Sequence, residues 1–257
     1  MARKQLFNPL TLFSVALSLE LALVSSLPIQ AQAQSKPGSS NPTTSTRANV
    51  RVTFDPPGSG KPRETAGGAS RGVQCPQEQA SLGGCVTLLV PTTQEGLTVA
   101  DRPAFFAYLP KTDAKQVFFS LVDESKNTVY QTKMPLQATG GIVSFKLPAD
   151  APALEIGKNY QWSLIVIGSQ GLRPDSPAVQ GWVRRVELNA TLKNQLEQAT
   201  LLERAALYGQ QGLWFDALES LAMVRQSQPS DSSLATNWQE LLTSVGLDAV
   251  ANKPLLQ

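Results

Sequence analysis

The chain has 257 residues, of which 42% are hydrophobic and 16% charged, a composition typical of a packed protein and not of a disordered one. Its 22 Lys and Arg residues against 20 Asp and Glu leave a net charge of +2, which argues against nucleic acid as a partner. The sequence contains no histidine, which excludes Ser-His and Cys-His nucleophile pairs and removes the usual zinc ligand. We therefore expect no enzymatic activity, no catalytic residue, no bound metal and no cofactor.

The N-terminus has the pattern of a secretory signal peptide over residues 1–33. Two basic residues precede the apolar stretch Leu10–Leu23, and Ala31–Ala33 offers a small-x-small cleavage site. Glu20 and the short apolar length favour a cleaved signal over a retained membrane anchor. We expect a secreted protein, periplasmic or extracellular, with no membrane span after signal cleavage.

Residues 34–72 are rich in Ser, Thr, Pro and Gly, with too few apolar residues to form a core, and are predicted to be a disordered tether. Within them, Val50–Phe54 alternates as a strand does, and we expect it to dock on the body as an edge strand. Cys75 and Cys85 are the only cysteines. In an oxidising compartment they predict one short-loop disulfide, since the CxxC spacing and the further ligands of a redox or metal site are missing.

Residues 73–188 are predicted to form an immunoglobulin-like antiparallel β-sandwich. Short β-branched and aromatic runs alternate there with turn residues, as at Thr92–Gly96. The segment Leu154–Tyr160 is similar to the corner of immunoglobulin-like and fibronectin type III domains, where a Tyr bonds back to the backbone. Tyr160–Ile167 is apolar on both sides, so we expect this strand to be covered on both faces. The expected strands lie within residues 86–90, 103–109, 117–122, 128–134, 142–147, 160–167 and 179–188.

Residues 189–257 are predicted to form a C-terminal helical region, a hairpin or a three-helix cap packed on the sandwich. Apolar residues from Leu192 to Ala206 mark a first helix that Gly209 ends, and a second helix begins at Trp214. A third helix is expected between Pro229–Asp231 and Gly246. Together, the first two helices resemble one tetratricopeptide helical pair. A single pair of this kind cannot bury its apolar face alone, so we expect it to pack on the sandwich.

The candidate site residues are Trp182 and Arg184. In a regular strand they share one face with Val186, which would set a guanidinium beside buried apolar groups. Arg184 then pairs with a carboxylate at the sheet rim, or a bulge turns it outward. The functional alternative is a patch that binds a partner, because Trp and Arg are enriched at binding hot spots. The other three tryptophans, Trp162, Trp214 and Trp238, have the spacing of core residues.

Several motifs taken together resemble a secreted cyanobacterial family catalogued as domain of unknown function 928. No single motif is diagnostic, but their order and spacing agree over about residues 50–255. The resemblance implies a periplasmic or extracellular protein with no assigned activity. The family often carries a further cysteine near the sixth strand, where this chain has Ile167. The motifs are Gly67–Gly72, the Cys75 and Cys85 pair, Pro103–Pro110, Gly157–Trp162, Gly181–Arg185, Gly212–Leu218 and Trp238–Leu247.

The leading functional hypothesis is a non-enzymatic exported module that contacts an unidentified protein partner in the periplasm or at the cell surface. Gly68–Gly72 fits the GxSxG pattern of a nucleophile elbow, but no strand or helix pattern flanks it and no histidine can activate Ser70, so we interpret it as a turn. Two alternatives stay open. One is a cell-envelope glycan hydrolase that uses paired carboxylates, and the other is a carbohydrate-binding module.

Overall fold

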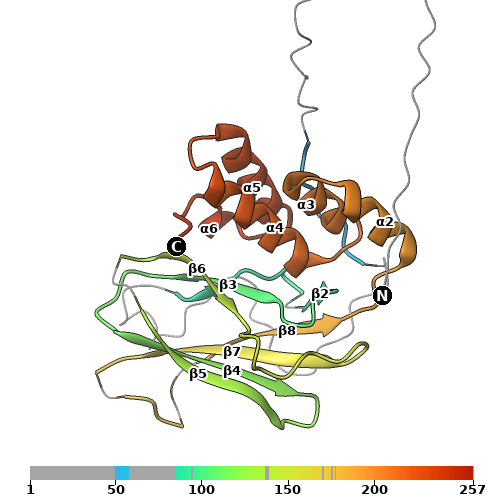
Figure 1. Cartoon of the computed structure of the whole chain (residues 1–257). Coiled ribbons are helices and arrows are strands. Elements are labelled where there is room, and N and C mark those ends of the chain that lie inside the picture. The colour runs from blue at the N-terminus through green and yellow to red at the C-terminus, as the bar shows by residue number, and fades with distance from the viewer. Residues whose placement is uncertain are drawn as a thin grey trace, which may run out of the picture. The chain divides into compact units, whose positions relative to one another are not determined.

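The computed structural model describes residues 50–57, 85–93, 95–136, 139–169, 171–174, 176 and 178–256 (Figure 1). The predicted signal peptide at residues 1–33, most of the predicted tether and Cys75 lie outside these residues. The described chain is a mixed α/β fold in which two sheets are compatible with a β-sandwich, and helices follow the strands along the sequence.

Each of the seven expected runs contains a strand. The smaller sheet has the order β1-β3-β6, and the larger has the order β2-β8-β7-β4-β5. The helices lie on the side of the smaller sheet, so the outer face of the larger sheet points away from them (Figure 1). The strands are β1 (Thr87–Leu88), β2 (Glu95–Thr98), β3 (Ala104–Leu109), β4 (Gln116–Asp123), β5 (Thr128–Pro135), β6 (Gly141–Lys146), β7 (Asn159–Ile167) and β8 (Val179–Arg185).

Strand β2 corrects two expectations. Residues 95 and 96 were expected in a turn but belong to β2, which pairs in parallel with β8, so the prediction of a wholly antiparallel sandwich is wrong at this pair. Gly96 is needed for close approach and not for turning. A Cβ there would lie 2.6 Å from the ring of Phe215 on the helix α4 (Trp214–Ser227), so only glycine lets this helix pack so tightly on the strand.

Aromatic side chains fill the space between the two sheets. The Phe105 ring on β3 lies 4.8 Å from the Trp162 ring on β7 and 5.3 Å from the Phe119 ring on β4, measured between centroids. Along β7 buried and partly buried residues alternate strictly, so only one face of this strand is covered. The expectation of cover on both faces is therefore wrong. Ile165 and Ile167 lie on the outer face because the helices pack elsewhere, against β2 and β3.

Five helices follow β8, more than the expected hairpin or three-helix cap. The segment expected to form the first helix forms two helices, because Thr200 caps a new helix and Glu203 completes a capping box there. The predicted start signal at Pro229–Asp231 is confirmed, with Asp231 as the N-cap, and so is the stop at Gly246, whose φ is 81°. The helices are α2 (Ala190–Gln198), α3 (Leu201–Gln210), α4 (Trp214–Ser227), α5 (Ser232–Ser244) and α6 (Asp248–Ala251).

Helices and sheets share one hydrophobic core. Trp162, Trp214 and Trp238 are fully buried, which confirms their assignment to the core. The Trp214 indole N–H donates a 2.8 Å hydrogen bond to the Leu89 carbonyl oxygen beside β1. Helix α4 packs against α3 and against β2 and β3, so the helical pair packs on the sheets as expected.

Residues 50–57 dock on the helices and not on a sheet edge, so the expectation of an edge strand at Val50–Phe54 is wrong. Val52 is buried, and its N–H donates to the Asn237 side-chain oxygen of α5 at 2.7 Å. The Asp55 N–H donates to the Gly209 carbonyl oxygen of α3 at 3.0 Å. A Cβ at Gly209 would lie 2.1 Å from the Thr53 carbonyl oxygen, so this contact requires glycine.

Candidate functional site

The predicted site residues Trp182 and Arg184 lie on the outer face of the larger sheet. Gly181 and Val183 of β8 are buried, whereas Trp182 is partly exposed and Arg184 is exposed. β8 pairs with β7 without a register shift between Asn159 and Leu164, so no bulge turns Arg184 outward. Arg184 is exposed because the face of β8 that carries it is the outer face of the larger sheet. The expectation that this face is buried is wrong, and Arg184 forms no ion pair with any described residue.

Polar side chains surround the Trp182 indole. The Lys126 Nζ lies 5.4 Å from its ring centroid, a cation–π contact. The same ammonium donates to Gln161 Oε1 at 2.8 Å, and Gln161 Nε2 donates to Gln180 Oε1 at 2.9 Å. The side chains come from β7, β8 and the β4–β5 turn, so strand pairing assembles residues that are far apart in sequence.

The β4–β5 turn holds Lys126 in place. Lys126 has φ 68°, a left-handed backbone that is costly for a residue other than glycine or asparagine. Asp123 compensates, because its Oδ1 accepts the Asn127 N–H at 2.8 Å and its Oδ2 accepts the Asn127 side-chain N–H at 2.9 Å. These hydrogen bonds from Asn127 lower the pKa of the Asp123 carboxyl.

The same sheet face carries apolar side chains that no core uses. Phe118 of β4 lies directly opposite Ile165 of β7, and both are partly exposed. Neither residue, nor Trp182, belongs to either hydrophobic core cluster of the described chain. Ser120 and Ser163 form a polar row between the Phe118 and Trp182 positions. The face therefore alternates apolar and polar rows.

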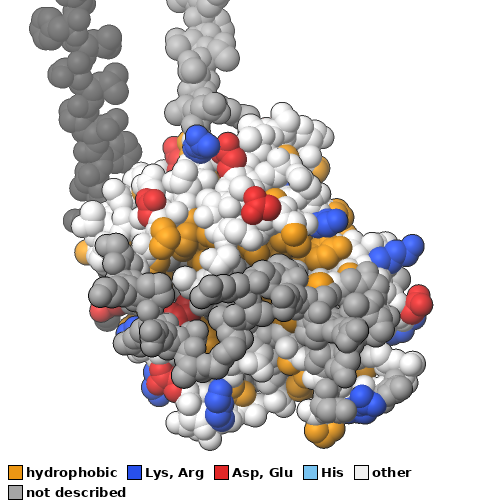
Figure 2. Space-filling model, turned by 180° about the vertical axis from the view of Figure 1, so that it is seen from behind, with side chains coloured by type: hydrophobic (Ala, Val, Ile, Leu, Met, Phe, Trp, Pro, Cys, Tyr) orange, Lys and Arg blue, Asp and Glu red, His pale blue; other side chains and the backbone are white. Residues whose placement is uncertain are grey.

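Figure 2 shows the molecule from behind. Lys and Arg side chains are scattered among Asp and Glu on this side, and hydrophobic side chains gather in a band near its middle.

Among the described residues, no group of three or more His, Cys, Asp or Glu side chains is placed to hold a metal ion. No helix in the described part of the chain has both the length and the apolar character needed to cross a membrane.

A buried carboxyl group on α4 was not singled out from the sequence. Asp216 Oδ2 accepts the Val99 N–H at 3.1 Å, and the Thr98 side chain also hydrogen-bonds to this carboxyl. Burial raises the pKa of Asp216 to about 7, despite these hydrogen bonds. No feature of the local sequence distinguishes Asp216 from an exposed first-turn Asp, because its hydrogen-bond partners Thr98 and Val99 lie over a hundred positions away in sequence.

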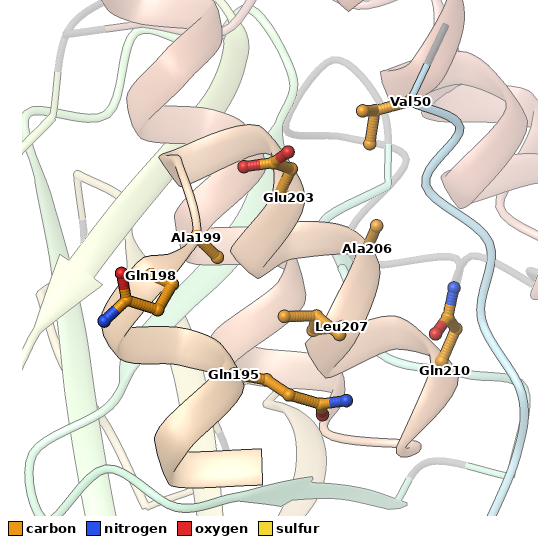
Figure 3. A pocket seen from close by; sticks show the side chains of 8 residues that line it. All are labelled: Val50, Gln195, Gln198, Ala199, Glu203, Ala206, Leu207 and Gln210. Atoms are coloured by element: carbon orange, nitrogen blue, oxygen red, sulfur yellow. The ribbon is translucent and has the colours of Figure 1, made fainter. Parts of the chain in front are cut away.

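A groove of about 390 Å³ lies between α2, α3 and residues 50–57 (Figure 3). Its floor is apolar, its rim carries glutamine amides, and its one carboxylate, Glu203, is bonded to Thr200. A smaller cavity of about 150 Å³ lies at the open side of the sandwich, next to Phe119 and Tyr130. The groove is lined by Val50, Gln195, Gln198, Ala199, Glu203, Ala206, Leu207 and Gln210.

The predicted disulfide is only half within the described chain. Cys85 is not a free thiol, but Cys75 lies outside the described residues, so the pairing stays a prediction. The Gly-rich motif at residues 67–72 lies outside them as well. The predicted corner is described: the Tyr160 hydroxyl accepts the Glu155 N–H at 3.0 Å, as the Leu154–Tyr160 pattern indicated.

Comparison with curated proteins gives no match to this chain. A family model described as Domain of Unknown Function (DUF928) matches residues 66–255, which include every described strand and helix. The matched range contains the expected motifs from Gly67–Gly72 to Trp238–Leu247. The chain therefore belongs to the DUF928 family.

Proposed function

We propose that this protein is an exported, non-enzymatic module that binds a protein partner through the outer face of the larger sheet. The observation that carries the proposal is the set of partly exposed apolar side chains Phe118, Ile165 and Trp182, which no core uses, beside an Arg184 without an ion pair. Trp and Arg are the residue types that most often dominate binding energy at protein interfaces.

Export is the second part of the proposal, and the N-terminal sequence supports it. Residues 1–33 have the charged start, apolar stretch and small-residue cleavage site of a secretory signal. The Ser, Thr, Pro and Gly of residues 34–49, which precede the docked segment 50–57, suit a tether that lets the folded part reach a partner in the periplasm or at the cell surface.

We also propose that the two sheets form a variant of the immunoglobulin-like sandwich. The strand orders β1-β3-β6 and β2-β8-β7-β4-β5 match a sandwich whose first strand is divided between both sheets. The Tyr160 hydrogen bond to the Glu155 N–H lies at the start of β7, where such domains have their tyrosine corner. Trp162, two residues later, occupies the position at which antibody domains have a cysteine, and its ring fills the space between the sheets.

A second candidate function is carbohydrate binding at the same face. A partly exposed indole with the amides of Gln161 and Gln180 beside it can stack on a sugar ring and bond its hydroxyls. The apolar row of Phe118 and Ile165 favours a protein partner instead, because a protein has aliphatic side chains that can pack on this row and a sugar does not. The glycan-hydrolase alternative requires a pair of carboxylates facing one cavity, and the described residues that line the α2–α3 groove and the cavity beside Phe119 include no such pair.

Site-specific photo-crosslinking tests the proposal in the full chain expressed in its host. A photoreactive residue at Gln180 probes the outer face, and one at the exposed Ser144 of β6 is the matched control. We expect one protein to crosslink from position 180 and not from position 144, and Trp182→Ala to abolish the crosslink. Equal crosslinking from both positions, or a crosslink that Trp182→Ala leaves unchanged, would refute the proposed face.

A further inference from the structure

We infer that Lys126, Trp182 and Arg184 together clamp a carboxylate side chain within an acidic segment of the partner protein. The inference rests on the proposed function and names the chemistry that the outer face selects. Lys126 Nζ lies over the Trp182 ring, and Arg184 follows Trp182 on the same face of β8. A carboxylate between the two cations would bond to both, while its neighbouring apolar groups pack on the indole.

The strained turn is the first argument. A left-handed backbone at a lysine costs free energy, and such positions persist where the surroundings fix them, often at binding sites. Here Asp123 and Asn127 fix the turn by two hydrogen bonds, and the Lys126 N–H donates to the Asp123 carbonyl oxygen at 3.0 Å. The turn thus presents the ammonium over Trp182 instead of leaving it to sample solvent.

The unmatched charge is the second argument. Lys126 bonds only to the neutral Gln161 among the described residues, and Arg184 forms no ion pair there. Asp123 and Glu124 of the same turn accept hydrogen bonds from the neutral amides of Asn127 and Asn159 and keep their negative charge, but neither forms an ion pair with Lys126 or Arg184. Glu95 lies opposite Trp182 on β2 and is exposed, so one carboxylate borders the two cations. Among the described residues, both cations of the clamp are therefore without a carboxylate partner in direct contact.

The rows of the face are the third argument and point to a peptide. Along a strand, residues on one face recur about every 7 Å, which is also the spacing of alternate side chains in an extended peptide. The Trp182 and Gln161 row, the Ser163 and Ser120 row and the Ile165 and Phe118 row follow at this interval. An extended segment with a carboxylate at one end and an apolar side chain at the other fits these rows.

Tryptophan fluorescence gives a direct measurement, because three of the four tryptophans are fully buried and Trp182 alone is partly exposed. Acrylamide quenching of the full chain therefore reports mainly on Trp182, and Trp182→Phe verifies this assignment. The probes are a capped hexapeptide with Glu, Ser and Leu, the same peptide with Gln for Glu, and hexagalacturonate. We expect the Glu peptide to protect Trp182 from quenching, the Gln peptide not to, and added salt to weaken the protection.

Charge variants separate the clamp from the general face. Lys126→Asn removes the charge but keeps a residue type that tolerates the left-handed backbone. Lys126→Asn and Arg184→Gln are each expected to weaken peptide binding about five- to tenfold. Lys126→Arg keeps the positive charge and should retain most of the peptide binding. Lys133→Gln on β5, opposite Phe118, removes a charge from the same face and should change binding less than about twofold.

The two proposals can fail separately. Equal protection by the Gln peptide, protection by hexagalacturonate alone, or unchanged binding in both charge variants would overturn the carboxylate clamp. In each of these cases a protein crosslink from position 180 that depends on Trp182 would leave the binding face itself intact. Loss of that crosslink, with peptide protection retained, would overturn the proposed function instead.

Discussion

The Asp216 carboxylate on α4 accepts a 3.1 Å hydrogen bond from the backbone N–H of Val99, just beyond β2. The bond links a helix to an edge strand across 117 residues of sequence. The chain thus joins these elements through a group whose protonation changes near neutral pH.

The stability of the protein should carry a pH dependence that comes from Asp216. Burial raises its pKa from 3.8 to about 7, so the folded state binds a proton more tightly than the unfolded state does. This group's contribution is greatest below about pH 4, falls as the pH rises to about 7 and is lost above that. The difference corresponds to at most about 4 kcal/mol. Urea unfolding of Asp216→Asn and of the original chain, at several pH values, measures it.

The Asp216→Asn protein should gain stability relative to the original chain as the pH rises from about 4 to about 7. Asp248→Asn is the control, because Asp248 is an exposed first-turn residue of α6. A stability difference between Asp216→Asn and the original chain that does not change with pH would contradict the assignment.

Removing the Tyr160 hydroxyl should destabilise the β7 corner. Tyr160→Phe leaves the Glu155 N–H without its 3.0 Å partner, at a cost of about 1 kcal/mol. Tyr130→Phe removes a hydroxyl from a partly exposed ring on β5 and should cost less. Denaturation midpoints of the two variants decide the matter, and equal midpoints would show that the corner bond contributes nothing.

Adding a methyl group at Gly209 should release the N-terminal segment from the helices. Alanine normally stabilises a helix relative to glycine by about 1 kcal/mol, but here its Cβ would meet the Thr53 carbonyl oxygen. We expect Gly209→Ala to increase amide exchange at residues 50–57, and Asn237→Ala to do the same by removing the bond to Val52. Unchanged exchange in Gly209→Ala would mean that the segment shifts without losing its contacts.

The predicted Cys75–Cys85 disulfide should stabilise the exported protein by about 2 to 3 kcal/mol, since it closes a short loop. Cys75→Ser and Cys85→Ser should then lower stability equally, and the double variant no further. Alkylation with and without reductant, followed by mass spectrometry, counts the free thiols. Two free thiols in the unreduced exported protein would rule the bond out.

The strands were predictable where β-branched and aromatic residues recur over six or more residues between turn residues, as in β6 and β7. Strand β2 was not, because Glu95–Thr98 is short and contains a glycine, and the glycine serves a contact with Phe215 that only the folded chain reveals. The break between α2 and α3 was missed because the apolar spacing continues across Thr200.

The candidate site was predictable in part. Trp182 and Arg184 share a face by strand period, which the sequence alone indicates. Their exposure depends on where the helices pack, and Lys126 reaches Trp182 only through the pairing of β4, β7 and β8. Sequence reasoning therefore found two residues of the face but not their third neighbour.

The bond from the Trp214 indole to the Leu89 carbonyl has a practical consequence for dissecting this protein. Ending the chain after β8 would strip the cover from Leu89 and Phe105 and expose the aromatic interior to water. Sheets and helices therefore make up the smallest unit that can be produced by itself, and cooperative melting in a single step is its expected behaviour.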